Sequence, residues 1–132
     1  MVQQAGGAQG LVETFLQAIE MHDPEGARAC LADEGFHYRS PISEFTDADS
    51  FIADMTYRTG IVQRMEIRKA FADGNDLCHI LSVHIQISSR VRVDAVIWSR
   101  VLDGRIQWME VLFDAYPYRA LFPAGTEPPS WL

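Results

Sequence analysis

Cysteine is scarce in this sequence, and its placement excludes two classes of protein. The 132 residues include two cysteines, Cys30 and Cys78. They are too few for a disulfide framework and too far apart for a Cys-x-x-Cys redox or metal motif. We therefore expect two buried thiols in a reduced, cytoplasmic protein.

Positive charge and long apolar runs are also scarce. Eleven lysines and arginines against eighteen acidic residues give a formal net charge of −7, and Lys69 is the only lysine. This balance argues against nucleic acid or an anionic membrane surface as a partner, since both are bound by clustered cations. No apolar run reaches the ~18 residues of a membrane span. Residues 1–10 lack the basic and apolar segments of a signal peptide.

What is present fits one globular domain. At about 150 residues per domain, the chain makes a single domain over residues 1–132. Apolar residues make up 48% of the chain, which is ordinary for a soluble protein with a sizeable core. We place the core at about residues 11–122 and predict an irregular, proline-containing tail over residues 123–132.

The first part of the chain has helical patterns and the second part alternates like strands. Apolar spacing predicts a first helix over residues 11–21. A second, short helix is predicted after Asp23, which would cap it, with Pro24 in its first position. A third helix is predicted to begin at a Thr46–Asp49 capping box and to run through Met55. Residues 36–40 predict a short strand that Pro41 ends. Longer strands are predicted over residues 62–72, 77–88, 92–102 and 105–114. The fold class is therefore α+β, with three helices packed on a strongly curved antiparallel sheet around a cone-shaped pocket.

The turn signal Asp103-Gly104 gives an expected register for the last two strands. A two-residue turn there pairs Trp98 with Met109, Val96 with Val111, and Asp94 with Phe113. These side chains would form one continuous, mainly apolar side, which we take as the inner face of the sheet. Leu77, Leu81, Val83 and Ile85 of the preceding strand alternate in agreement.

The outer face is expected to be partly apolar as well. In this register it carries Ile80, Ile97, Val101, Ile106, Trp108 and Leu112. So much apolar surface predicts a homodimer packed through the outer sheet face. The alternative is that the tail, with Trp131 and Leu132, folds back over it.

Asp94 is the main candidate for chemistry. Between Ile85 and Phe113 its carboxyl group would be desolvated, which raises a carboxyl pKa and suits proton transfer on an enolisable substrate. The alternatives are an ion pair with Arg92, or a different register that leaves Asp94 exposed.

Other candidates surround this position. Tyr38 is expected to point inward and to donate a hydrogen bond to a substrate carbonyl, unless the backbone satisfies its hydroxyl. Asp114 is a candidate acid at the pocket mouth, or a strand-end carboxylate bonded to loop amides or Arg119. The expected ligand-binding side chains, which could instead fill the space themselves, are Phe15, Ser40, Met55, Val96, Trp98, Met109, Val111 and Phe113.

The four histidines do not predict a metal site. His22 lies in a loop, and His37 and His84 alternate away from the expected core. His79 faces inward, near Arg100 at the expected pocket rim, and is a weaker candidate for a proton shuttle. Because no set of ligands emerges, neither a metal nor another cofactor is expected.

Three patterns in this order resemble the nuclear-transport-factor-2-like (NTF2-like) superfamily, especially its polyketide-cyclase-like (SnoaL-like) and ketosteroid-isomerase-like branches. The first is Phe15-Leu16-Gln17-Ala18-Ile19 running into His22-Asp23-Pro24-Glu25 and then Cys30-Leu31-Ala32-Asp33. The second is a strand ending in Ser40-Pro41 before a helix, and the third is Asp103-Gly104-Arg105-Ile106 leading to Phe113-Asp114. The resemblance covers about residues 11–122. It implies a curved sheet over three helices, a deep apolar pocket and frequent dimers.

The family's best-known catalytic groups do not carry over to this chain. The resemblance places Phe15, Ser40 and Trp98 where ketosteroid isomerases hold a tyrosine, a carboxylate base and a protonated acid. Asp114 fits the last aspartate of the related epoxide hydrolases, but the strand that should supply their Arg and Asp pair reads Ser82-Val83-His84. The cyclase-like branch stays open, because the positions of its pocket acids vary.

Two functions therefore remain. The first is a cofactor-independent isomerase, cyclase or dehydratase for a small hydrophobic carbonyl compound, in which Asp94 moves the proton while Tyr38 and Ser40 hold the oxygen. The second is a non-catalytic module for ligand binding or dimerisation. A solvent-open pocket with Asp94 on its wall would favour the enzyme, and an aromatic-filled interior would favour the module.

Overall fold

A computed structural model describes residues 7–58, 61–86 and 89–114. Helices α1 (Gly7–Glu20) and α2 (Pro24–Ala29) precede two short strands, β1 (His37–Arg39) and β2 (Glu44–Phe45), and helix α3 (Ala48–Arg58). Four long strands follow: β3 (Val62–Asp73), β4 (Asp76–Gln86), β5 (Arg90–Leu102) and β6 (Arg105–Phe113). The predicted α+β fold is confirmed. The predicted tail lies outside the described residues.

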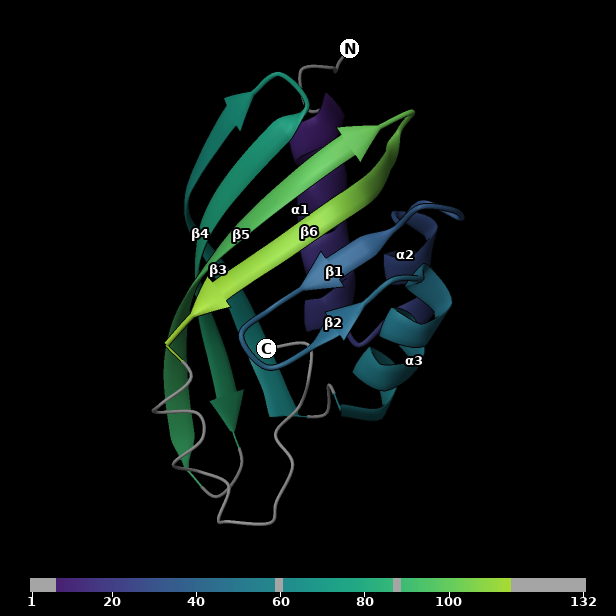
Figure 1. Cartoon of the computed structure of the whole chain (residues 1–132). Helices are drawn as coiled ribbons and strands as arrows, with labels where there is room; N and C mark the ends of the chain where they lie inside the picture. The colour runs from purple at the N-terminus through teal and green to yellow at the C-terminus, as the bar shows by residue number, and fades with distance from the viewer. Residues whose placement is uncertain (1–6, 59–60, 87–88, 115–132) are drawn as a thin grey trace.

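The six strands form one mixed sheet in the order β2-β1-β6-β5-β4-β3. Strands β3 to β6 are an antiparallel meander, as expected, but β1 pairs with β6 in parallel. Helix α1 lies behind β5 and β6, and α2 and α3 lie beside the β1–β2 edge (Figure 1). None of these three helices lies on the face of β3 to β6 that points toward the viewer in Figure 1, which we call the outer face.

Local chemistry explains where the helices begin. The Asp23 side chain accepts a hydrogen bond from Gly26 N at 3.0 Å, which confirms the predicted cap of α2. Helix α3 is capped by Asp47, whose Oδ1 accepts from Ser50 N at 2.7 Å. The predicted Thr46–Asp49 capping box was wrong, because Asp47, and not Thr46, accepts the hydrogen bond at the start of α3.

The Asp103-Gly104 turn is confirmed, but the register beyond it differs from the prediction. Both turn residues have positive φ, as a tight two-residue hairpin requires, and Leu102 pairs with Arg105. Opposite the step from Arg100 to Val101, Gln107 is an extra residue of β6, and this bulge shifts the pairing by one residue. An extra residue in one strand reverses which neighbours share a face.

This shift places different β5 side chains on the inner face. Met109 faces Ser99 and Val111 faces Ile97, whereas Trp98 pairs with Glu110 on the other side. The inward β5 residues are Val93, Ala95, Ile97, Ser99 and Val101, all buried. The β4 prediction is confirmed, since Leu77, Leu81, Val83 and Ile85 are buried in the same core.

The predicted outer face needs the matching correction. Ile97, Val101 and Ile106 are buried in the core rather than on the outer face. Ile80, Trp108 and Leu112 lie on the outer side as expected, and Val96 and Trp98 join them. The outer face therefore remains apolar at its centre, but with partly different residues.

Candidate functional site

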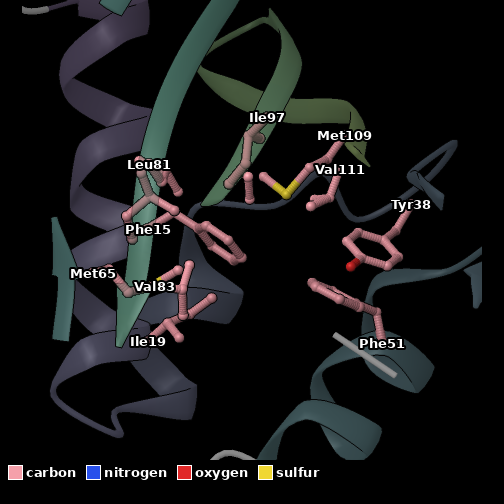
Figure 2. Close-up of a pocket in the computed structure, with 12 residues that line it drawn as sticks. Phe15, Ile19, Tyr38, Phe51, Met65, Leu81, Val83, Ile97, Met109 and Val111 are labelled. Atoms are coloured by element: carbon pink, nitrogen blue, oxygen red, sulfur yellow. The ribbon is translucent and has the colours of Figure 1, made fainter. Parts of the chain in front are cut away.

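The inner face encloses a small apolar cavity of about 20 Å³. That volume holds about one water molecule and no organic ligand. Phe15 of α1 and Phe51 of α3 project toward it from opposite sides, with Met109 between them (Figure 2). Its lining consists of Phe15, Leu16, Ile19, Tyr38, Phe51, Met65, Leu81, Val83, Ala95, Ile97, Met109 and Val111.

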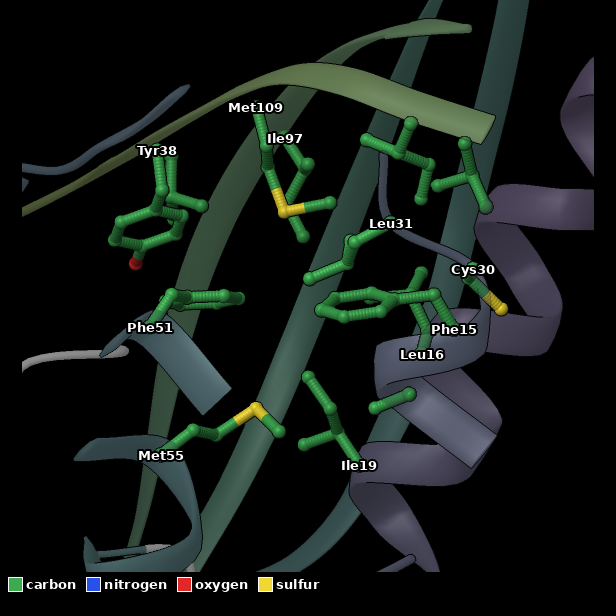
Figure 3. Packing of buried hydrophobic residues seen from close by; sticks show 14 of the residues in the cluster. Phe15, Leu16, Ile19, Cys30, Leu31, Tyr38, Phe51, Met55, Ile97 and Met109 are labelled. Carbon is green, nitrogen blue, oxygen red and sulfur yellow. The ribbon is translucent and has the colours of Figure 1, made fainter. Parts of the chain in front are cut away.

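Aromatic rings fill most of the interior around this cavity. The Phe51 ring stacks on Tyr38 with centroids 4.3 Å apart and lies 6.3 Å from the ring of Phe15. Phe36 and Phe45 pack on Phe51 at 5.6 Å and 5.8 Å. Leu31, Met55 and Met109 close the remaining space (Figure 3). Such ring pairs add stability beyond the area that they bury.

Tyr38 is the polar residue in the lining of this cavity. It is buried as predicted, and burial raises the pKa of its phenol well above the usual range, so the hydroxyl stays protonated at neutral pH. The charge of Asp54 acts in the same direction, while hydrogen bonds with Ser40 and Ser43 act against it. The phenol is thus already engaged by neighbouring polar groups.

Ser40 and Asp54 complete this polar corner. Ser40 Oγ lies 3.1 Å from Ser43 Oγ and accepts a hydrogen bond from Ile42 N at 3.2 Å. Ser40 is therefore held at the end of β1 rather than on the cavity wall. Asp54 was missed at the sequence level, although its position one turn from Phe51 on α3 was a usable signal.

Asp94 is not part of this interior. Its side chain is 50% exposed on the outer face, where Oδ1 lies 3.3 Å from Arg92 Nε and 3.6 Å from Arg68 Nη1. Ser82 Oγ donates a hydrogen bond to it at 3.0 Å. The predicted placement in an apolar recess was wrong, because the extra β6 residue, Gln107, shifts the pairing of the two strands by one, so that Asp94 points outward. The alternative of a different register that leaves Asp94 exposed is confirmed, and the ion pair with Arg92 forms on the outer face rather than near the pocket.

The other predicted ligand-binding residues divide between the two faces. Phe15, Met109 and Val111 line the cavity, and Met55 and Phe113 pack in or against the core without lining it. Val96 and Trp98 were wrongly placed inside, for the same reason as Asp94. Asp114 follows directly after β6 and is exposed, and its role as a pocket-mouth acid stays a prediction.

His79 faces inward as predicted, but its neighbour differs. It is fully buried, and its Nε2 lies 3.1 Å from Glu13 Oε2 on α1. Arg100 instead lies on the outer face, where its Nε donates to Asp76 Oδ1 at 2.9 Å. Among the described residues, no group of three or more His, Cys, Asp or Glu side chains could hold a metal ion.

The outer face carries an exposed apolar cluster on β4, β5 and β6. Trp98 is 39% exposed and Leu112 is 54% exposed. Trp98 packs edge-on against Trp108 with centroids 5.6 Å apart, and the Arg100 guanidinium lies over Trp98 at 5.8 Å. We define the outer-face cluster as Ile80, Val96, Trp98, Trp108 and Leu112.

Charged pairs flank this cluster along the strands. At one end Asp76 binds both Arg100 and the indole Nε1 of Trp98, and these hydrogen bonds lower the pKa of the Asp76 carboxyl group. At the other end Asp94 binds Arg92, and Glu66 Oε1 lies 3.3 Å from His84 Nε2. The centre of the face is thus mainly apolar, with Glu110 of β6 opposite Trp98, and much of the charge at its margins is paired.

Comparison with known proteins identifies the fold. No protein-family model matches the sequence, and no curated protein matches it either. Among solved structures, the chain is similar to an NTF2-like protein of unknown function from Cytophaga hutchinsonii, with 22% identity, 90% of this chain and 99% of that chain covered, and a TM-score of 0.77. An NTF2-like protein of unknown function from Burkholderia pseudomallei gives 17% identity, 89% and 98% coverage, and a TM-score of 0.78.

A structure with an assigned activity is also similar. An LEH-like epoxide hydrolase from M. tuberculosis shares 26% identity, with 83% of this chain and 84% of that chain covered and a TM-score of 0.75. The chain therefore has the NTF2-like fold, as its sequence patterns predicted. No helix among the described residues is long and apolar enough to cross a membrane.

Proposed function

We propose that this chain is a non-catalytic, homodimer-forming NTF2-like domain, in which the outer-face cluster packs against the same cluster of a second copy. The supporting observation is the exposure of Trp98 and Leu112 at the centre of a sheet face. Contiguous exposed apolar surface of this kind marks interaction sites in soluble proteins. The filled interior supports a module rather than an enzyme.

Charge favours a second copy as the occupant. The ion pairs of Asp76 with Arg100 and of Asp94 with Arg92 are made within one chain, so these four charges next to the cluster need no partner from outside. A two-fold interface needs a self-complementary patch, and a mainly apolar centre beside internally paired charges meets that requirement.

Sedimentation equilibrium tests the proposal. The wild-type chain should have twice the mass of one chain, and the double variant Val96→Lys/Leu112→Lys should sediment as a monomer because it places two charges in the interface core. Gln17→Lys, on an exposed position of α1, is the matched control and should stay dimeric. A monomeric wild type, or a dimeric double-lysine variant, contradicts the proposal.

A second candidate is the binding of a small hydrophobic molecule inside the sheet. The apolar cavity and the protonated Tyr38 hydroxyl favour it. Because the cavity is so small, Phe51 or Met109 would have to move. Benzene is a suitable probe: a rise in melting temperature that Met109→Ala enhances would support this candidate, and no rise in either protein would reject it.

A further inference from the structure

Basic side chains gather at one end of the outer face. Arg64, His84 and Arg92 are cross-strand neighbours on β3, β4 and β5. Arg90 lies at the start of β5, two residues before Arg92, and therefore on the same side of that strand. On β3, a bulge between Val62 and Arg64 directly precedes the Arg64 position.

These side chains surround a surface depression of about 450 Å³, which we call the basic depression. Its lining includes four basic side chains, one amide and two apolar side chains: Arg64, His84, Arg90, Arg92, Gln63, Ile85 and Val91. Ile85 is buried and Val91 is half-buried. The site therefore offers charge at its rim and apolar contact at its side.

The local acids do not neutralise the basic depression. Asp94 lies between Arg92 and Arg68, and Glu66 contacts His84. Within residues 7–58, 61–86 and 89–114, no acidic side chain forms an ion pair with Arg64 or Arg90. The guanidinium groups of Arg64 and Arg90 are thus available to a ligand.

Stability alone does not account for this arrangement. The whole chain has eleven lysines and arginines and a net charge of −7, yet three of the eleven line this depression. Arg64 and Arg92 lie opposite His84 on its two sides and Arg90 lies opposite Gln86, so none of the three guanidinium groups has an acid as its cross-strand partner. An anion between the guanidinium groups would reduce the repulsion among them.

We propose that the basic depression binds a phosphate-type oxyanion, with Arg64 and Arg90 as its main ligands. A planar guanidinium donates two parallel hydrogen bonds to such a group, whereas an ammonium acts as a point charge. Arg92 and His84 add donors at the rim, and half-buried Val91 offers contact to an apolar part of an organic phosphate. The inference does not rest on the dimer, whose cluster lies further along the strands.

The experiment is a phosphate titration of the full chain by NMR, observing arginine Nε–H signals at constant ionic strength. Inorganic phosphate should shift the signals of Arg64 and Arg90 with saturation, and sodium chloride should not. The double variant Arg64→Gln/Arg90→Gln should weaken binding at least ~10-fold, the loss of about 1.4 kcal/mol. Arg64→Lys should also weaken phosphate binding, because a lysine keeps the charge but cannot donate two parallel hydrogen bonds.

Arg39→Gln is the matched control, since Arg39 is an exposed arginine on β1, outside the depression. It should leave phosphate affinity unchanged. Absence of saturable shifts, equal shifts at Arg39, or full binding by the double glutamine variant would each overturn the proposal. Unfolding curves of the variants should match the wild type, so that a lost site is distinguished from a lost fold.

Discussion

The two faces of this sheet are built from the same four long strands, but they differ in what their side chains do. On the inner face, aromatic rings of α1, α3 and β1 pack until about 20 Å³ is left. On the outer face, Trp98 and Leu112 are exposed between paired charges. In an NTF2-like fold, the surface available for recognition can thus be the sheet's exterior rather than its interior.

The largest expected difference between the faces concerns a phenylalanine. Phe51→Ala should lower the free energy of unfolding by about 3–5 kcal/mol, because it removes the ring on which four other aromatic rings pack. Phe71→Ala, at a 54% exposed position on β3, is the matched control and should cost less than ~1 kcal/mol. Urea unfolding measures both. Similar losses would show that the faces do not differ as described.

The next effect compares two His–Glu pairs. Glu13→Ala should cost about 1–3 kcal/mol, since buried His79 loses its one hydrogen-bond partner among the described residues. Glu66→Ala removes the partner of half-exposed His84 and should cost less than ~0.5 kcal/mol, because water replaces the carboxylate. Glu13→Gln should recover much of the loss. Equal costs for the two alanine variants would contradict the buried placement of His79.

Alkaline pH should test the buried phenol. The pKa of Tyr38 is raised in the folded protein, so its contribution to stability is complete below the ordinary tyrosine pKa of about 10 and is lost as pH rises above it. The wild-type free energy of unfolding should therefore fall above about pH 10, and less steeply in Tyr38→Phe. Parallel curves for the two proteins would mean that the Tyr38 hydroxyl reaches solvent.

The smallest effect is expected at Asp94. Asp94→Asn should change the free energy of unfolding by less than ~0.5 kcal/mol, because its ion pairs with Arg92 and Arg68 lie on an exposed surface. Asp73→Asn, at the exposed end of β3, is the reference. A loss above ~2 kcal/mol at Asp94 alone would favour the inward placement that the sequence first indicated.

The sequence predicted the elements of this fold better than its register. Periodicity located α1, the capping chemistry of Asp23 located α2, and Asp103-Gly104 located the last hairpin. The bulge at Gln107 of β6, opposite Arg100–Val101, has no glycine or proline to mark it, so period-two counting continued through it. One such residue moved Asp94, Val96 and Trp98 to the opposite face.

The candidate site was predicted only where it did not depend on that register. Phe15, Tyr38, Met109 and Val111 line the cavity as expected, since they lie on α1, β1 and β6. Whether large apolar side chains line a pocket or fill it depends on packing between elements distant in sequence. That packing centres on Phe51, which the sequence marked only as an apolar residue of the third helix.

The contrast between the two faces is tested most directly by hydroxyl-radical footprinting of Trp98 and Met109 at several protein concentrations. Both residue types react readily, and the two side chains lie on opposite faces. Trp98 should be protected at high concentration and labelled on dilution, while Met109 stays protected throughout. Concentration-independent labelling of Trp98, or labelling of Met109 in the folded protein, would contradict the assignment of a closed interior and a dimerising exterior.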